Sequence, residues 1–154
     1  SKESIKKFAK NNQVIDNVSS EVKVYREEDV IAKSNESIKL LWNELKERLS
    51  ALSNVEFVPN ANSAYIKFTK NAKGVCYFSF KKQLIKGEII RGNIYPDGKK
   101  SKNFFVIDDP KDMCKDYNFT YKSGIEGHRY LFDISNDANL DYIEMLIKQK
   151  YNQI

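Results

Sequence analysis

From Ser63 to Ile94 the chain reads SAYIKFTKNAKGVCYFSFKKQLIKGEIIRGNI, which contains three short runs of strand type over residues 63–69, 75–82 and 83–94. The first two runs alternate apolar and polar residues with the period of two that is typical of a half-buried strand. The turn-forming sequence NAKG separates them, so we expect neighbouring runs to pair antiparallel. The segment therefore predicts an antiparallel meander.

The alternation assigns the two faces of this meander. The side chains predicted to face the core are Ala64, Ile66, Phe68, Cys76, Phe78 and Phe80. Those predicted to face solvent are Tyr65, Lys67, Thr69, Tyr77, Ser79 and Lys81. Because Cys76 falls on the apolar side, we interpret it as a small buried hydrophobic residue and not as a redox group.

Basic residues are concentrated in the middle of the chain. Between Lys67 and Lys102 there are ten basic residues and two acidic ones, a local net charge of +8. The whole chain carries only +5, so the remainder is about −3. Because clustered lysines attract phosphate groups, this regional charge points to nucleic acid as a partner.

Length and composition bound the class of protein. A chain of 154 residues is long enough for one full core but short for two domains. Its two cysteines, which are not in CxxC spacing, favour a reducing compartment. No run approaches the roughly 20 apolar residues of a membrane span, and no signal peptide is visible. We expect a soluble, cytoplasmic protein with no membrane association, no cofactor and no metal site.

Two amphipathic helices flank the strands. Ser34 or Asn35 can cap a helix that runs to about Leu52, and Asn136 or Asp137 can cap a helix that runs to the end of the chain. Both carry an apolar stripe at helical spacing. The residues of the two stripes are Ile38, Leu41, Trp42, Leu45, Leu49 and Leu52, and Leu140, Ile143, Leu146, Ile147, Tyr151 and Ile154.

The remaining segments complete the expected architecture. Asp109 followed by Pro110 predicts the start of a short helix that ends near Tyr117, and a strand follows with Tyr130 and its alternate neighbours on one face. We expect residues 1–33 to be a lead-in segment or the tail of an upstream element, and residues 34–154 to form one α+β domain. Its predicted sheet is mainly antiparallel, has four to five strands and is covered on one face by the two helices.

Five pieces of the sequence carry a resemblance to a known family. They are AYIKF (64–68), FKKQLIKGEI (80–89), DDPKDMCKDY (108–117), the Gly-His pair at 127–128, and LDYIEMLIKQKY (140–151). In this order they resemble a widespread uncharacterised bacterial and archaeal domain, loosely labelled "predicted transport protein". The resemblance covers about four-fifths of the chain, from Ser34 to its end.

The resemblance implies a biological context. Members of that family commonly lie at the C-terminus of longer proteins whose upstream part resembles a restriction-type nuclease or a GmrSD-type DNA-modification-dependent restriction system. The family has no assigned catalytic residues. The chain begins at Ser1 and not at Met, which also suggests a segment of a longer polypeptide. We therefore expect a nuclease domain or subunit as a partner.

The favoured hypothesis is a non-catalytic accessory domain that binds nucleic acid through a basic sheet face. Lysines along such a face would neutralise phosphates, and interleaved tyrosines would stack on bases. The candidate binding residues are Lys67, Lys81, Lys82, Lys86, Arg91, Lys99, Lys100, Lys102, Tyr65 and Tyr77. A purely structural alternative is that these lysines protect the sheet from aggregation.

Two other function classes stay open. A protein-interaction module that docks a nuclease partner would show an exposed apolar patch and no salt-sensitive nucleic-acid binding. A metal-dependent nuclease would use Asp16, Glu21 and Lys23, because Glu21-Val22-Lys23 matches the E-x-K half of a restriction-type motif, together with His128. His128 is the only histidine, and hydrogen bonding at a strand start explains it more readily than catalysis. The sequence thus favours a non-enzymatic role.

Overall fold

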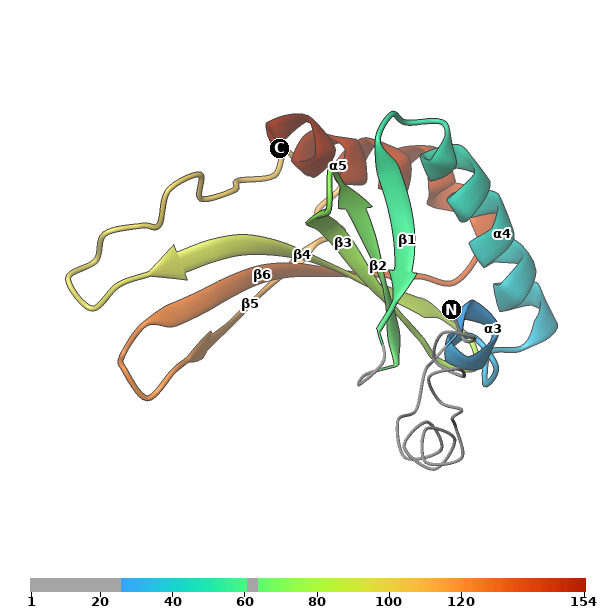
Figure 1. The fold of residues 1–154 in the computed structure, drawn as a ribbon, viewed down its shortest axis with the longest axis horizontal. Coiled ribbons are helices and arrows are strands. Elements are labelled where there is room, and N and C mark those ends of the chain that lie inside the picture. The colour runs from blue at the N-terminus through green and yellow to red at the C-terminus, as the bar shows by residue number, and fades with distance from the viewer. Residues whose placement is uncertain (1–25, 61–63) are drawn as a thin grey trace, which may run out of the picture.

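The computed structural model describes residues 26–60 and 64–154, which form an α+β fold with a single six-stranded antiparallel sheet (Figure 1). The sequence predicted four to five strands, so the sheet has one strand more than the larger of these numbers. Its strands, in the spatial order β1-β2-β3-β4-β6-β5, are β1 (Val55–Pro59), β2 (Tyr65–Lys70), β3 (Lys73–Phe80), β4 (Ile85–Ile94), β6 (Glu126–Ile134) and β5 (Lys115–Thr120). The helices are α3 (Glu27–Val30), α4 (Glu36–Ser50) and α5 (Leu140–Gln153), with a 3₁₀ turn, η1 (Asp137–Asn139), before α5. Within these ranges no helix is long and apolar enough to cross a membrane.

The predicted meander is confirmed, and so are its two faces except at two residues. Thr69, predicted to face solvent, is buried, because the register of β2 against β3 shifts between Phe68 and Thr69. Ala64, predicted to face the core, lies exposed before β2 begins. Strands β2, β3 and β4 pair antiparallel in sequence order, and Ile66 and Phe78, which lie opposite each other, are fully buried. Cys76 is also buried, and burial raises the pKa of its thiol, so it is an inert core residue as expected. Tyr65, Lys67, Tyr77 and Ser79 alternate with these residues and lie on the opposite face.

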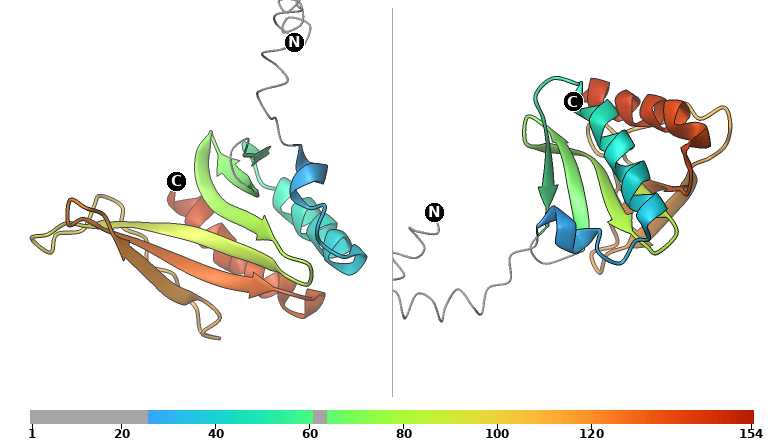
Figure 2. Two further views of the ribbon diagram at one scale, coloured as in Figure 1. Left: turned by 90° about the horizontal axis from the view of Figure 1, so that it is seen from below. Right: turned by 90° about the vertical axis from the view of Figure 1, so that its right-hand side faces the viewer.

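Helices α4 and α5 cover one face of the sheet, as predicted (Figure 2). The side chain of Asn35 caps α4 by accepting a hydrogen bond from the Ile38 amide at 3.0 Å. Trp42 is completely buried against phenylalanine rings of the sheet, with ring centroids 5.0 Å from Phe78. The two helices are tied together by Arg48, whose guanidinium lies 2.5 Å from the Asp141 carboxylate.

The sequence analysis placed the start of the domain at residue 34. In the structure, helix α3 upstream of this residue also packs against the domain. Val30 of α3 is only 3% exposed and belongs to the core. The carboxylate of Glu27 accepts hydrogen bonds from the Trp42 indole at 2.8 Å and from the Lys46 ammonium at 2.5 Å. Helix α3 therefore packs as part of the domain.

The short helix predicted over residues 110–117 is wrong, because this segment forms a turn followed by strand β5. The Asp109 carboxylate accepts hydrogen bonds from the Met113 and Cys114 amides at 3.1 and 2.8 Å. Asp112 has a φ of 53°, in the left-handed region, which ends any helix there. Asp109 thus caps a single turn, and the chain leaves it extended.

Beyond residue 88, strand β4 continues with β6 and β5 as an arm that projects from the rest of the sheet (Figure 1). Gly92 has a φ of 138° at the bulge where the register of β4 against β6 shifts. The loop over residues 101–114 returns along the helix side of this arm and buries Phe105. The helices and this loop therefore occupy the same side of the sheet.

Candidate functional site

The face of the sheet opposite α4 and α5, here called the open face, is the candidate site. It consists of the alternate side chains of the strands that point away from the helices, including Tyr65, Tyr77, Glu88 and Arg129. Among residues 26–60 and 64–154 no helix lies against it (Figure 2). Half-buried and exposed side chains on this face are thus available to a ligand.

Aromatic rings are the main feature of the open face. Tyr65 of β2 and Tyr77 of β3 form an edge-to-face pair with ring centroids 5.5 Å apart. A second row of rings runs along β5. The centroid of the Phe119 ring lies 6.1 Å from that of the Tyr117 ring and 4.8 Å from that of the Tyr121 ring. Tyr117 and Tyr121 are each 47% exposed. Aromatic rings of β2, β3 and β5 therefore lie on one face that no helix of the described part of the chain covers.

Two cations of the open face are already paired with carboxylates. The ammonium of Lys86 lies 3.0 Å from the Asp133 carboxylate. The guanidinium of Arg129 forms an ion pair with the Glu88 carboxylate. Arg129 is also stacked on the Phe119 ring, with 4.7 Å from its central carbon to the ring centroid. These ion pairs hold the side chains in place and lower the net charge of the face.

Two other lysines on this face have no carboxylate partner among the described residues. Lys67 lies on β2 opposite Tyr77, and Lys115 begins β5 opposite Leu131. Neither side chain is engaged in an ion pair within the part of the chain that the structure describes. They are the cations of the open face that could neutralise phosphate charge.

A hollow of about 310 Å³ lies at the centre of the open face, where the arm leaves the rest of the sheet. Its lining residues come from four strands: Tyr65, Tyr77, Ser79, Glu88, Ile90 and Arg129. Burial raises the pKa of the Tyr77 hydroxyl, and the neighbouring Tyr65 and Glu88 act in the same direction. The hydroxyl is therefore a neutral hydrogen-bonding group at physiological pH.

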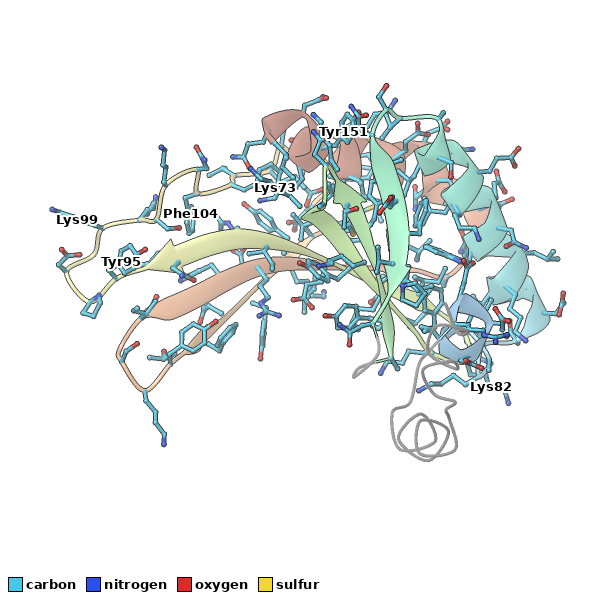
Figure 3. All side chains as sticks on the ribbon, in the orientation of Figure 1. Lys73, Lys82, Tyr95, Lys99, Phe104 and Tyr151 are labelled. Atoms are coloured by element: carbon cyan, nitrogen blue, oxygen red, sulfur yellow. The ribbon has the colours of Figure 1, made fainter. Side chains whose placement is uncertain are left out.

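The predicted binding lysines do not form one patch. Lys81 and Lys82 lie in the turn between β3 and β4, whereas Lys99, Lys100 and Lys102 lie beyond the other end of β4. Because β4 has ten residues and a strand rises about 3.3 Å per residue, the two groups are roughly 30 Å apart. Figure 3 shows Lys82 and Lys99 at opposite ends of the molecule. Only Tyr65, Tyr77, Lys67 and Lys86 of the predicted set belong to the open face.

Arg91 lies on the helix side of the sheet, away from the other predicted binding residues. Its Nε donates a hydrogen bond to the Phe105 carbonyl at 3.0 Å, and its guanidinium lies 4.4 Å from the centroid of the Tyr130 ring and 4.9 Å from that of Phe104. A carboxylate oxygen of Asp116 lies 3.5 Å away. These contacts hold the loop over residues 101–114 against the arm, so Arg91 has a structural role.

Sequence reasoning missed half of the open face. The missed residues are Lys115, Tyr117, Phe119, Tyr121 and Arg129. The signal was present, since aromatic residues alternate in the sequence YNFTY over residues 117–121. The helix predicted over residues 110–117 concealed this alternation, because it overlapped the first residues of β5.

The nuclease hypothesis gains no support from the described residues. Asp16, Glu21 and Lys23 lie outside them. His128 lies within β6, where its Nε2 is 2.9 Å from a Glu126 carboxylate oxygen and its ring packs near Phe104. In residues 26–60 and 64–154, no three acidic, histidine or cysteine side chains gather closely enough to hold a metal ion.

Comparison with known proteins adds no further constraint. No protein-family model matches the sequence, and searches of curated proteins and of solved structures also found no match. A proposal for its function must therefore rest on the residues of the open face.

Proposed function

We propose that the open face binds single-stranded nucleic acid, and that the chain is a non-catalytic accessory domain of a restriction or phage-defence nuclease. The observation that carries the proposal is the set of aromatic rings on a sheet face that no described helix covers, with Lys67 and Lys115, which have no carboxylate partner among residues 26–60 and 64–154, beside them. Proteins that bind single strands combine such stacking rings with cations that follow the phosphates.

The spacing of the rings favours a strand of several nucleotides. Tyr77 lies on β3 and Tyr117 on β5, which are separated by β4 and β6. Because neighbouring strands are about 4.8 Å apart, the two rows of rings are about 14 Å apart. A single strand lying across the sheet would place different bases on the two rows, with its phosphates near Lys67 and Lys115.

The same geometry disfavours a duplex. In a double helix the faces of the bases are stacked on one another, so tyrosine rings cannot reach them. Binding to duplex would depend on phosphate contacts alone. Because Lys86 and Arg129 are already paired, the open face offers few cations for this purpose. We expect duplex DNA to bind more weakly than a single strand of the same length.

The association with a nuclease is supported by the resemblance of five sequence pieces to a domain found at the C-terminus of restriction-type proteins. A domain that holds a single strand would retain DNA near such a nuclease. This part of the proposal predicts that the chain forms a complex with a nuclease domain or subunit, which copurification with that subunit would test.

The binding itself is tested by fluorescence-anisotropy titration of the full chain with labelled 12-nucleotide single-stranded DNA, RNA and duplex DNA at two salt concentrations. We expect micromolar binding to single strands that weakens as salt increases, and weaker binding to duplex. No binding to any of the three at low salt would overturn the proposal. Tighter binding to duplex than to single strands would also contradict it.

A second candidate function is docking of a protein partner on the same face. Four large apolar side chains on or beside the open face are 38–47% exposed, namely Val58, Ile90, Tyr117 and Tyr121. Large apolar side chains that are exposed on one face of a protein can form part of a protein interface. A complex with the nuclease subunit that is insensitive to salt and is lost on Ile90→Glu substitution, without nucleic-acid binding, would favour this alternative.

A further inference from the structure

The hollow of the open face contains an acidic group, which is unexpected on a surface that binds phosphates. Glu88 lies on β4 between Tyr77 of β3 and Leu131 of β6. Its side chain is 27% exposed, so it faces the hollow while being partly shielded from solvent. A carboxylate repels phosphate but accepts hydrogen bonds from the N–H groups of a base. Glu88 therefore points to recognition of a base edge at this position.

Arg129 supplies a donor beside this acceptor. Its guanidinium is paired with Glu88 and is fixed from the other side by the Phe119 ring. A guanidinium has five N–H donors and a carboxylate has about four lone-pair positions, so both groups keep free hydrogen-bonding capacity while they are paired. The hollow thus presents an acceptor and a donor side by side, held by contacts within the protein.

The walls of the hollow suit a flat ring. Tyr77 and Ile90 both line it, and the volume of about 310 Å³ can accommodate one base. The Tyr77 ring extends over Gly74, where an added Cβ would lie 2.4 Å from its hydroxyl oxygen. Gly74 therefore leaves room for the ring to extend along β3, because a Cβ at this position would collide with it.

We propose that the hollow binds a single guanine base of the bound strand. Guanine has two adjacent donors, N1–H and the N2 amine, that a carboxylate accepts together, and it has O6 next to them as an acceptor for a guanidinium. Glu88 takes the two donors, Arg129 donates to O6, and Tyr77 stacks on the ring. Uracil offers one ring N–H, and adenine offers one amine beside an acceptor, so neither satisfies both groups equally. This inference rests on the proposed function.

The test compares four labelled 10-nucleotide RNAs that consist of uridine except for one central base, which is uracil, guanine, adenine or hypoxanthine. We expect the guanine oligonucleotide to bind about 10-fold more tightly than the all-uridine one. Hypoxanthine lacks the N2 amine, so its oligonucleotide is expected to bind with intermediate affinity. Glu88→Gln is expected to remove the preference for guanine over uracil, because an amide cannot accept the N1–H and N2 hydrogen bonds together.

Glu47→Gln is the matched control, because Glu47 is exposed on α4 at the other side of the sheet and its substitution changes the net charge equally. It is expected to keep the guanine preference. If all four RNAs bind equally, the guanine site is wrong while single-strand binding stands. If none binds, both proposals fail. A guanine preference that Glu88→Gln leaves intact excludes Glu88 as its source, and the hypoxanthine result tests base-edge recognition without any substitution.

Discussion

Tyr77 lies directly opposite Glu88 in the last residue pair that joins β3 to β4, and beyond this pair the two strands separate. From this point β4 continues into the arm with β6 and β5, while β3 turns back towards β2. The hollow forms at this junction because the strands diverge there. The hollow of the open face is thus a direct consequence of where the β3–β4 pairing ends.

Tyr77→Ala should weaken binding of single-stranded nucleic acid. Stacking of a base on an aromatic side chain contributes about 1–3 kcal/mol, which corresponds to a roughly 5- to 150-fold increase in Kd. Fluorescence-anisotropy titration measures this change. Tyr77→Phe keeps the ring and should keep most of the affinity. Equal affinities for Tyr77→Ala and the wild type would show that the ring does not stack on the ligand.

The lysines of the open face should determine the salt dependence of binding. The variant with Lys67→Ala and Lys115→Ala should reduce the slope of log K against log salt by about 0.7 for each lysine on a single strand. The control is the variant with Lys82→Ala and Lys99→Ala, which removes the same charge from the two ends of the molecule (Figure 3). If the control reduces the slope equally, the phosphates follow the ends of the molecule and not the open face.

Much of the fold can be predicted from the sequence because apolar periodicity reports burial directly. The stripes containing Trp42 and Ile143 repeat at helical spacing, and both residues are fully buried in the helices that were expected. The alternation through Tyr77 and Phe78 places one on the open face and the other in the core. In these segments the local pattern and the tertiary packing agree.

Strand β5 and the position of Arg91 were not predicted. A local helix signal outweighed the aromatic alternation of β5, and the position of Arg91 depends on contacts between distant segments. All but one of the residues of β5 are exposed, so the alternation of its aromatic residues is not matched by an alternation of buried and exposed positions. The preceding Asp109-Pro110 pair is a strong local helix signal, yet Asp109 binds Tyr142 of α5 and the amides of its own turn. From the sequence alone, Arg91 is interpreted as a surface cation. In the structure, the loop over residues 101–114 packs against it.

Arg91→Ala should destabilise the fold and leave ligand binding unchanged. The substitution removes the hydrogen bond to the Phe105 carbonyl and the stacking on Tyr130, which together contribute about 2 kcal/mol. Urea denaturation followed by circular dichroism measures this loss as a lower midpoint. Arg91→Lys should restore little stability, because an ammonium cannot reproduce the planar stacking. Unchanged stability with weaker binding would instead place Arg91 in the binding site.

Gly87→Ala should destabilise the core beneath the open face. A Cβ added at Gly87 would lie on the helix side of the sheet, 2.4 Å from two carbons of the Phe132 ring. Such overpacking costs about 1–3 kcal/mol, which urea denaturation would detect. In a double-mutant cycle, Phe132→Leu should cost less in the Gly87→Ala background than in the wild type, because the smaller side chain relieves the clash. Additive effects would contradict a direct contact.

The turn at Asp109 should lose its stabilising effect at acidic pH. Burial alone would raise the pKa of the Asp109 carboxyl, but hydrogen bonds from the Tyr142 hydroxyl and from the Cys114 and Met113 amides hold this pKa below its ordinary value of 3.8. Because the pKa is lower in the folded state than in the unfolded state, the carboxylate stabilises the fold above pH 3.8, and this contribution disappears as the pH falls through the folded-state pKa.

Asp109→Asn should therefore lower the free energy of unfolding at pH 7 by about 1 kcal/mol, which is less than the roughly 1.5–3 kcal/mol of a hydrogen bond to a charged group, because the turn is partly exposed. The difference from the wild type should shrink as the pH is lowered below 3.8. Urea denaturation of both proteins at several pH values measures it. Asp108→Asn is the control, since the Gln149 side chain binds the backbone of Asp108 and not its carboxylate. A difference between wild type and Asp109→Asn that stays constant down to pH 2 would show that the charge of Asp109 is not what stabilises the turn.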